Sequence, residues 1–342
     1  MKDGEFILYA RITAQKLFED VSALNNGIGF IAPLGVNNGT IEYADFSQIN
    51  SLIVCGTTGS GKTAFIKTVI ASLISTNPPE NLKLCIFDSL KINYLEFATI
   101  PHLLMPILND VSRCSGMLSW ALDEAEKRTL LLDKTTIDSK FPDVFVILDD
   151  YAQVAQNIDI QKTLYKLIQI NHRVKIHIFI ATSIDLAEII PTKIKAHISH
   201  RISFFLPERR NSLVVIDQNG AETLKMPGQF IAKFDSEAKT YNSLEISDDD
   251  IKNICNMYVN KENTVTSNTN LSDDELYNAA VLAVIEIGEA STTILQRALY
   301  IGYGRASKLL DCMLENGIIG PRNISKVHPI LITKEQFLHN KP

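Results

Sequence analysis

The chain has 342 residues, of which 46 % are hydrophobic and 21 % charged, and its net charge is −6 at pH 7. This balance excludes extensive disorder, and the length suits one large domain plus a smaller one. The charge excludes a protein that coats nucleic acid with its whole surface, but it permits a ring or cleft with a few focused basic side chains. The five cysteines form no C-x-x-C pair. We therefore expect free thiols and a reducing compartment.

The amino terminus, MKDGEFILYARIT, lacks the basic start and long apolar stretch of a secretory leader. No segment approaches the roughly 18 uninterrupted apolar residues of a membrane helix. We therefore expect a cytoplasmic protein without an intrinsic membrane segment, which would need a membrane-anchored partner to reach a membrane.

Apolar strand-like runs alternate with amphipathic helical stretches over residues 1–259. The runs are EFILYA, SLIVC, LKLCIFD, DVFVILDD, HIFIATS, RISFFLP and QFIAKF. Continuous apolar runs suit strands that are covered on both faces in a mostly parallel sheet. The stretches TAFIKTVIASLIS and SGMLSWALDEAEKRTLLL have helical spacing of their apolar residues. This alternation predicts a doubly wound α/β domain, in which residues 1–40 form a small N-terminal subregion.

The composition changes after this domain. Residues 260–272, NKENTVTSNTNLS, are polar and predict a flexible linker. Residues 273–335 contain three helical periods, and an Asn316-Gly317 turn then precedes a strand-like segment. This order predicts a winged helix-turn-helix DNA-binding domain. In its third helix, we expect a buried stripe made of Leu309, Leu310, Met313 and Leu314.

The strongest chemical signal is Gly56-x-x-x-x-Gly61-Lys62-Thr63, which follows an apolar run and opens a helix. Backbone N–H groups of such a loop point at phosphate oxygens, and the amino terminus of the helix favours the same charge. We expect Lys62 to bridge the β- and γ-phosphates of ATP and the Thr63 hydroxyl to bind Mg²⁺. The expected nucleotide-binding residues are Gly56, Thr57, Thr58, Gly59, Ser60, Gly61, Lys62 and Thr63.

A phosphate loop of this kind needs an acidic partner at the end of a neighbouring strand. Two runs compete, one ending at Asp88 and the other at Asp149-Asp150. We prefer Asp149 for the metal and Asp150 as the base that polarises water, which leaves Asp88 as an ordinary strand-end residue. Thr182 ends a later strand, where a hydroxyl either senses the γ-phosphate or caps the strand.

Four ordered motifs resemble the FtsK/SpoIIIE family of double-stranded DNA translocases. They are GTTGSGKT, IPHLL at 100–104, DQNGAE at 217–222 and the carboxy-terminal stretch from ASTTILQ to IIGP. The resemblance extends over roughly residues 25–321. It implies a RecA-like P-loop NTPase motor joined to a winged-helix module. It also implies a homo-oligomer, a hexameric ring, that hydrolyses ATP at subunit interfaces and moves double-stranded DNA through its pore.

The resemblance also assigns arginines. A family arginine falls near His172 and Arg173, and Arg201 matches an arginine of the strand RISFF. Arg173 or Arg201 would then be the catalytic finger that reaches a neighbouring subunit's γ-phosphate, with an ordinary surface arginine as the alternative. Arg209 matches a family lysine. We expect Arg209 and Arg210 to contact DNA phosphates in the channel, unless they lie in a solvated turn.

Some positions depart from the family pattern. The family has Asp-Glu where this chain has Asp149-Asp150, and the family's strand-end Gln is Ser183 here. Family positions that contact bases fall on Gly304, Lys308 and Asp311. Because Gly304 has no side-chain donor or acceptor, we expect Lys308, Asp311 and the adjacent Arg305 to make the DNA contacts, with altered or weaker specificity. A tail that only joins proteins is the alternative.

Two other functions fit part of these signals. One is a nucleotide-dependent DNA-binding assembly factor that does not hydrolyse ATP, which the altered Asp150 and Ser183 positions favour. The other is a secretion-type motor of the same family, for which a DNA-binding tail has no evident use.

Overall fold

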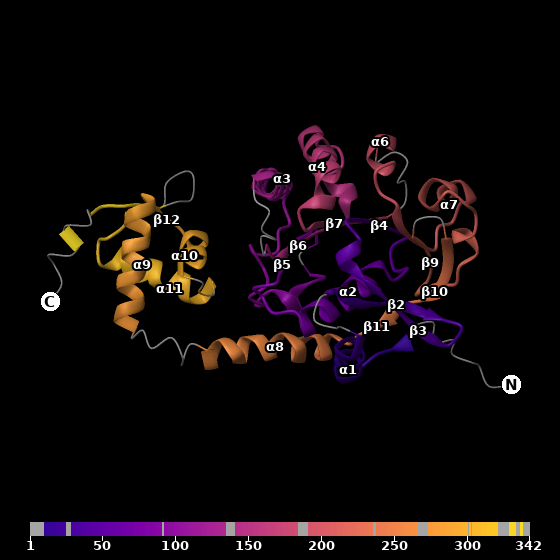
Figure 1. Ribbon diagram of the computed structural model, residues 1–342, viewed down its shortest axis with the longest axis horizontal. Helices are drawn as coiled ribbons and strands as arrows, with labels where there is room; N and C mark the ends of the chain where they lie inside the picture. The colour runs from indigo at the N-terminus through magenta and orange to yellow at the C-terminus, as the bar shows by residue number, and fades with distance from the viewer. Residues whose placement is uncertain are drawn as a thin grey trace. The chain divides into compact units, whose positions relative to one another are not determined.

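The computed structural model describes residues 10–24, 29–90, 92–134, 141–183, 191–234, 237–265, 273–299, 301, 303–320, 328–332 and 336–337. The chain divides into two compact units, Met1–Val259 and Asn260–Pro342. Figure 1 shows the elements of each unit. Within the described ranges, none of the helices is both long and apolar enough to cross a membrane.

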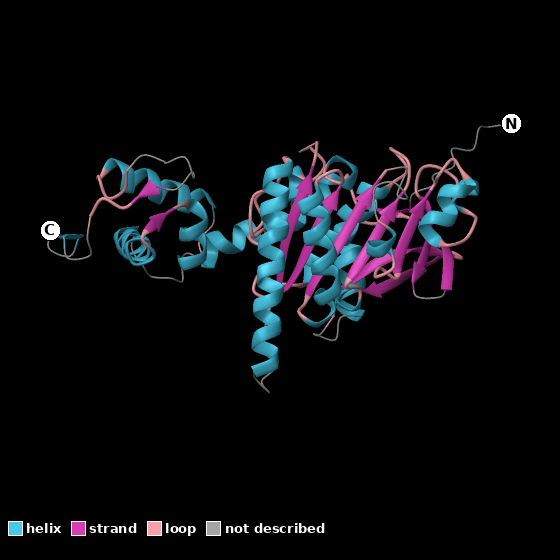
Figure 2. Cartoon of the chain, turned by 90° about the horizontal axis from the view of Figure 1, so that it is seen from above, coloured by secondary structure: helices cyan, strands magenta, loops and turns pink. Residues whose placement is uncertain are grey.

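A twisted sheet is the centre of the first unit, and among the described residues it has nine strands in the order β3-β2-β10-β9-β8-β4-β7-β6-β5. The strands from β8 to β5 are all parallel, whereas β9 is antiparallel to β8. Figure 2 shows them running side by side. Their bounds are Ile31–Asn37 (β2), Thr40–Asp45 (β3), Ser51–Cys55 (β4), Leu82–Asp88 (β5), Asp143–Asp149 (β6), Ile176–Thr182 (β7), His200–Phe204 (β8), Gln229–Phe234 (β9) and Glu237–Asn242 (β10).

One expected strand differs. Most of the run EFILYA lies outside the described residues. Ala10–Arg11 (β1) pairs instead with Leu244–Glu245 (β11) in a separate small sheet.

Helices cover both faces of the large sheet (Figure 1). One face carries Ala14–Leu24 (α1), Lys62–Thr76 (α2) and Asp248–Val265 (α8), and the other Val111–Lys134 (α3), Ile158–Ile170 (α4), Thr192–Lys195 (α6) and Arg209–Ile216 (α7). Successive side chains of β4 therefore enter different cores, Leu52 and Val54 the α2 side and Ile53 the α3 side. Burial on both faces explains why the strand runs are continuously apolar, and it confirms the doubly wound α/β prediction.

The strand order determines which loops meet. Strand β4 lies between β7 and β8, so that β7 separates β4 from β6 and β5 is the outermost strand. Because these strands are parallel, the residues after Cys55, Asp88, Asp149 and Thr182 all emerge at one edge of the sheet.

The second unit contains α9 (Asp273–Ile287), α10 (Thr292–Leu299) and α11 (Tyr303–Glu315), and a short antiparallel pair, β12 (Glu289–Ala290) with β13 (His328–Pro329). The core of this unit includes Ala306, Leu310 and Met313, which all lie on α11. Leu309 packs against this core and is only partly buried. The expectation for Leu314 was wrong, since it is 42 % exposed. Leu314 lies in the last turn of α11, just before the chain turns at Asn316 and Gly317.

The expected linker needs a correction. Helix α8 continues to Val265, so residues 260–265 are helical. Residues 266–272 lie outside the described part. Lys, Glu and Asn are all compatible with a helix that has already been nucleated upstream, so the polar composition did not exclude a helix here.

Candidate active site

The loop between β4 and α2 has the backbone of a phosphate cradle. Gly61 caps the amino end of α2 with φ 116°, a conformation that L-residues with side chains rarely adopt. At Gly56, an added Cβ would lie 2.6 Å from Cβ of Phe204, so the close approach of β8 excludes any side chain there. The backbone N–H of Thr57 donates to the carbonyl of Phe205 at 3.0 Å, which attaches the loop to the end of β8. Thr58 and Gly59 are exposed at the crest.

Lys62 places one positive charge at the centre of this loop. It is the first residue of α2, and its Nζ donates to the carbonyl oxygens of Gly56 (2.7 Å) and Thr57 (3.0 Å). Burial lowers the pKa of Lys62, while negative charge nearby, including Asp149 and Asp150, acts in the opposite direction. The cation is therefore held in a partly desolvated position where it interacts strongly with anions.

Thr63 and Asp149 meet although 86 positions separate them. The Thr63 hydroxyl donates to the Asp149 carboxylate at 3.3 Å, across the gap between α2 and the end of β6. Burial raises the pKa of Asp149, and the neighbouring Asp88 adds to this, while Tyr94, Lys62 and Thr63 oppose it. A hydroxyl and a carboxylate brought together beside a phosphate loop are oxygen ligands of the kind that Mg²⁺ uses.

Asp150 follows with an unusual backbone. Its φ is 61° and ψ 54°, the left-handed region, which Asp tolerates better than most residues. Ser89, the first residue after β5, donates its hydroxyl to Oδ2 of Asp150 at 3.0 Å. The half-buried Asp150 is thus held at the same edge of the sheet as the phosphate loop.

Asp88, the competing acid, is occupied by its own loop. It is 1 % exposed, and its carboxylate accepts hydrogen bonds from the backbone N–H groups of Leu90 and Asn93 and from the Asn93 side chain. Asp88 is the register partner of Asp149 on the neighbouring strand, so it lies beside Asp149 and Asp150.

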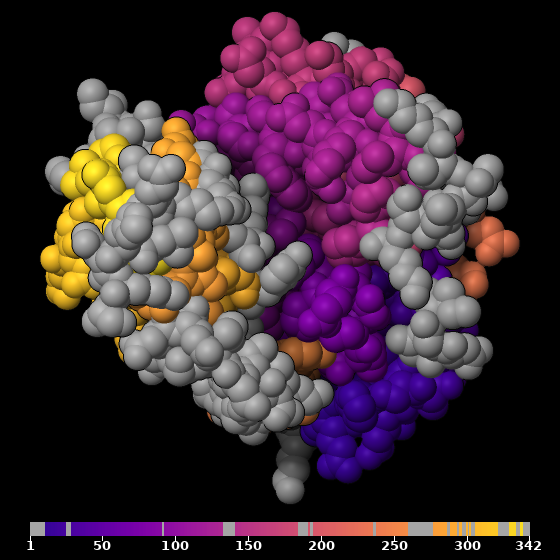
Figure 3. Space-filling model, turned by 60° about the vertical axis from the view of Figure 1, so that its left-hand side comes forward, coloured from indigo at the N-terminus to yellow at the C-terminus, as the bar shows by residue number. Residues whose placement is uncertain are grey.

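Sequence reasoning missed Ser89 and Tyr94. The Tyr94 side chain is fully buried, and its hydroxyl lies close enough to Asp149 to favour the ionised carboxylate without forming a hydrogen bond of normal geometry. Burial and then the charge of Asp149 raise the pKa of Tyr94 far above its usual range. Both residues follow β5, which ends at the same edge of the sheet as the phosphate loop, and this position in the sequence could have indicated them. The surface of this segment and of α3 is purple to magenta in Figure 3.

Ser60 Oγ and Thr182 Oγ1 are, like the Tyr94 hydroxyl, buried at the site without a hydrogen-bond partner among the described residues. Thr182 ends β7 directly beside Cys55, the last residue before the loop. A buried, unsatisfied polar group costs about 1–3 kcal/mol, so such groups suit a polar ligand. No cluster of three or more His, Cys, Asp or Glu side chains within the described ranges could hold a metal ion. A site with one carboxylate, one hydroxyl and added phosphate oxygens suits Mg²⁺ in particular.

The two candidate finger arginines lie in different settings. Arg173 is exposed in a 3-10 turn, Asn171–Arg173, before β7, at the sheet edge opposite the phosphate loop of its own chain. Arg201 is 8 % exposed and donates to the carbonyl of Ile198 at 2.9 Å and to the Asp217 carboxylate at 2.6 Å. Arg201 therefore ties β8 to α7, and it would have to give up these bonds to reach another subunit.

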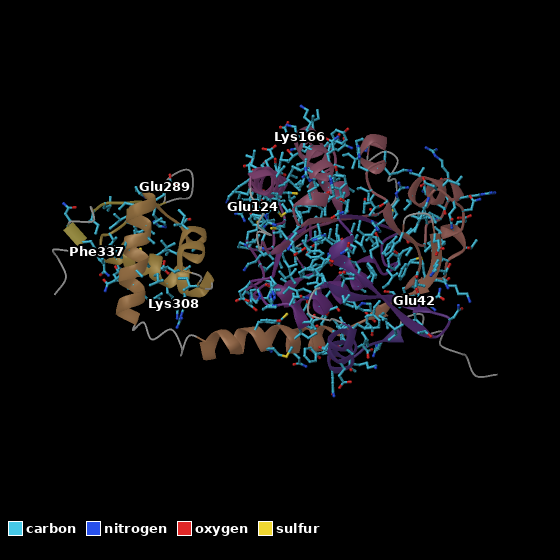
Figure 4. The ribbon with its side chains drawn as sticks, viewed as in Figure 1. Glu42, Glu124, Lys166, Glu289, Lys308 and Phe337 are labelled. Atoms are coloured by element: carbon cyan, nitrogen blue, oxygen red, sulfur yellow. The ribbon has the colours of Figure 1, made fainter. Side chains whose placement is uncertain are left out.

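The expected DNA contacts are all at the surface. Arg209 and Arg210 are exposed in the first turn of α7, which follows β8 at the same edge as the phosphate loop. On α11, Arg305, Lys308 and Asp311 are exposed and face away from the core of the second unit. Figure 4 shows the Lys308 side chain projecting from that unit.

A phosphate loop on β4 that meets an acid from β6, with β7 between the two strands, defines a P-loop NTPase fold of the RecA-like type. A family model described as FtsK/SpoIIIE family matches residues 23–224, and one described as Ftsk gamma domain matches residues 271–333. The chain belongs to the FtsK/SpoIIIE family.

Curated relatives agree with this assignment. The chain is 30 % identical to the DNA translocase FtsK of Clostridium tetani over 334 residues, which cover 88 % of this chain and 45 % of that protein. It is 31 % identical to FtsK of Chlamydia trachomatis over 86 % of this chain and 42 % of that protein. It is 28 % identical to the DNA translocase SpoIIIE of Bacillus subtilis over 89 % and 43 %. The chain thus spans less than half the length of these relatives.

Solved structures share the fold. The pCW3 conjugation coupling protein TcpA, in its monomer form with ATPγS, has a TM-score of 0.63 at 15 % identity, covering 74 % of this chain and 75 % of that one. The cytoplasmic domain of the type VII secretion ATPase EccC of Thermomonospora curvata has a TM-score of 0.59 at 17 % identity, covering 71 % and 34 %. At these identities the likeness concerns the fold alone.

Proposed function

We propose that this chain is the motor part of an ATP-dependent translocase of double-stranded DNA. The observation that carries the proposal is the meeting of the Thr63 hydroxyl and the Asp149 carboxylate, 3.3 Å apart, beside the partly buried Lys62 ammonium. The second unit supports the DNA part of the proposal, because it matches the gamma domain of the family and exposes Arg305 and Lys308 on one helix. The relatives named above are DNA translocases.

In this mechanism, each group has one task. The amides of residues 56–63 and the Lys62 ammonium bind the phosphates of ATP, and Thr63 and Asp149 hold Mg²⁺. Bound Mg²⁺ offsets phosphate charge. Asp150 accepts a proton from the attacking water. Thr182, whose hydroxyl has no partner among the described residues, donates to the γ-phosphate.

A channel around the DNA would be formed by several copies of the chain. We place Arg209 and Arg210 on the channel of a hexameric ring, where they contact DNA phosphates. Arg305, Lys308 and Asp311 contact a DNA groove. Arg173 or Arg201 is the finger that completes a neighbour's site; Arg173 is exposed, and Arg201 would first have to release Asp217. A cytoplasmic location and a membrane-anchored partner belong to the same proposal.

ATP turnover with and without long duplex DNA tests the function. Strong stimulation by DNA is the expected result, and turnover without stimulation would favour a secretion-type motor instead. Tight nucleotide binding without turnover would favour the non-hydrolysing assembly factor. Lys62→Ala is the matched negative control, because a helix accepts Ala at no cost in propensity while the phosphate-binding cation is lost.

A further inference from the structure

The segment after β5 is folded around one buried carboxylate. Asp88 accepts hydrogen bonds from the N–H of Leu90 at 3.2 Å, from the N–H of Asn93 at 2.8 Å and from the Asn93 side chain at 3.0 Å. Because Asp88 is 1 % exposed and is the last residue of β5, these bonds attach the loop to the sheet at its base. Ser89 sits within this bonded turn and is therefore held in place from both sides.

The hydroxyl of Ser89 reaches the neighbouring strand. It donates to Oδ2 of Asp150 at 3.0 Å, and Asp88 and Asp149 stand opposite each other in the register of β5 and β6. The bond occupies one oxygen of the Asp150 carboxylate and restricts rotation of the short side chain. The left-handed backbone conformation of Asp150 also fixes the direction in which its side chain leaves the backbone.

We infer that Ser89 is a positioning residue for the proposed catalytic base, holding Asp150 in the orientation that accepts the proton of the attacking water. The inference rests on the proposed function, since it assigns Ser89 a task in ATP hydrolysis. A base works only within hydrogen-bond reach of the proton it takes, so a freely rotating carboxylate spends less time in the productive orientation. Ser89 acts through Asp150, and we assign it no contact with the nucleotide or the attacking water.

The test compares the 342-residue wild type, Ser89→Ala and Ser89→Thr in steady-state ATPase assays with saturating DNA. We expect Ser89→Ala to lower kcat by about tenfold, with KM for ATP changed by less than about twofold, because the hydroxyl orients the base and does not bind the nucleotide. Ser89→Thr keeps the hydroxyl, and Ser89 is only half-buried. This variant should restore most of the lost kcat. Binding of a fluorescent ATP analogue and the melting temperature should be the same in all three proteins.

Ser199→Ala is the matched control. Ser199 is exposed, and its hydroxyl forms a hydrogen bond with the ring of His200, the first residue of β8, at the edge of the sheet opposite the phosphate loop. It should behave as wild type. An unchanged or raised kcat in Ser89→Ala would overturn the inference, as would a loss that Thr does not restore or that comes with equally weakened nucleotide binding. Absence of turnover in wild type is a different result, because it would refute the proposed function itself.

Discussion

The Thr63 hydroxyl donates to the Asp149 carboxylate across 3.3 Å and so links the first turn of α2 to the end of β6. If this pair holds Mg²⁺, Asp149→Asn should raise the half-saturating Mg²⁺ concentration for turnover by at least about tenfold, because an amide replaces a charged oxygen ligand. ATPase activity over a Mg²⁺ titration measures this. The exposed Asp123 of α3 provides the control, Asp123→Asn, which should not shift the curve. Equal curves for Asp149→Asn and wild type would remove Asp149 from the metal site.

Asp150 is expected to act in the chemical step alone. Asp150→Asn should bind ATP as tightly as wild type yet turn it over about 10²-fold more slowly or worse, because the base is lost. Asp150→Glu separates two possibilities. A longer side chain at a left-handed position would move the carboxylate away from Ser89, so we expect turnover to fall. A rise in turnover would show instead that the shorter side chain is a handicap. Single-turnover kinetics with a fluorescent-nucleotide binding control distinguishes these outcomes.

Arg209 and Arg210 should serve DNA rather than ATP. Replacing both with Ala should reduce DNA-stimulated ATPase activity and leave basal activity unchanged, because both side chains are exposed in the first turn of α7. The dependence of log affinity on log salt should also fall by about two, since each phosphate contact contributes about 0.9. A double Ala variant of Lys162 and Lys166, exposed on α4, is the control. The same DNA stimulation in both double variants would rule out this contact.

The second unit should bind duplex DNA through α11. Residues 273–342 have their own core, so the fragment is expected to fold alone and to bind labelled duplex weakly at low salt, with affinity falling as salt rises. Arg305 and Lys308 lie three positions apart and project from one side of the helix. Replacing both with Ala should weaken binding by about tenfold or more. Glu315→Ala, at the end of the same helix, is the control. No binding by the wild-type fragment would favour a module that only joins proteins.

His102, the histidine of the IPHLL motif, should make stability depend on pH. Its Nε2 donates to the carbonyl of Asn77 at 2.8 Å, and its Nδ1 is buried without a partner among the described residues. Burial lowers the pKa of His102 to about 4, so the folded state requires the neutral ring.

In the unfolded chain, His102 binds a proton as the pH falls through about 6.5, whereas in the folded state its ring is protonated only near pH 4. Stability from this group is therefore complete above pH 6.5 and decreases as pH falls, by up to about 3 kcal/mol. His102→Gln does not titrate and should lose less stability between pH 6.5 and 4. Urea unfolding followed by fluorescence of Trp120, the chain's single tryptophan, measures the free energy of unfolding at each pH. Parallel pH curves for the two proteins would contradict the assignment.

Local features of the site could be predicted because short-range rules govern them. The phosphate loop needs only a strand, glycines at the tight positions and a helix that opens at Lys62, all within a dozen neighbouring residues. The continuous apolar runs indicated strands with two covered faces, and the polar segment after residue 260 was expected to separate two units. The composition of that segment did not reveal that α8 continues to Val265, because polar residues fit a helix as well as a coil.

Contacts between strands could not be predicted from such short-range rules. The order of motifs along the chain showed that two acidic strand ends, Asp88 and Asp149-Asp150, compete for one loop. The bonds of Asp88 to its own turn are local, whereas strand order determines that Thr63 bonds Asp149 and that Ser89 reaches Asp150. The same holds for Arg201, whose partner Asp217 is on a different element. Strand order depends on how distant helices share the two faces of the sheet, and no window of neighbouring residues contains that information.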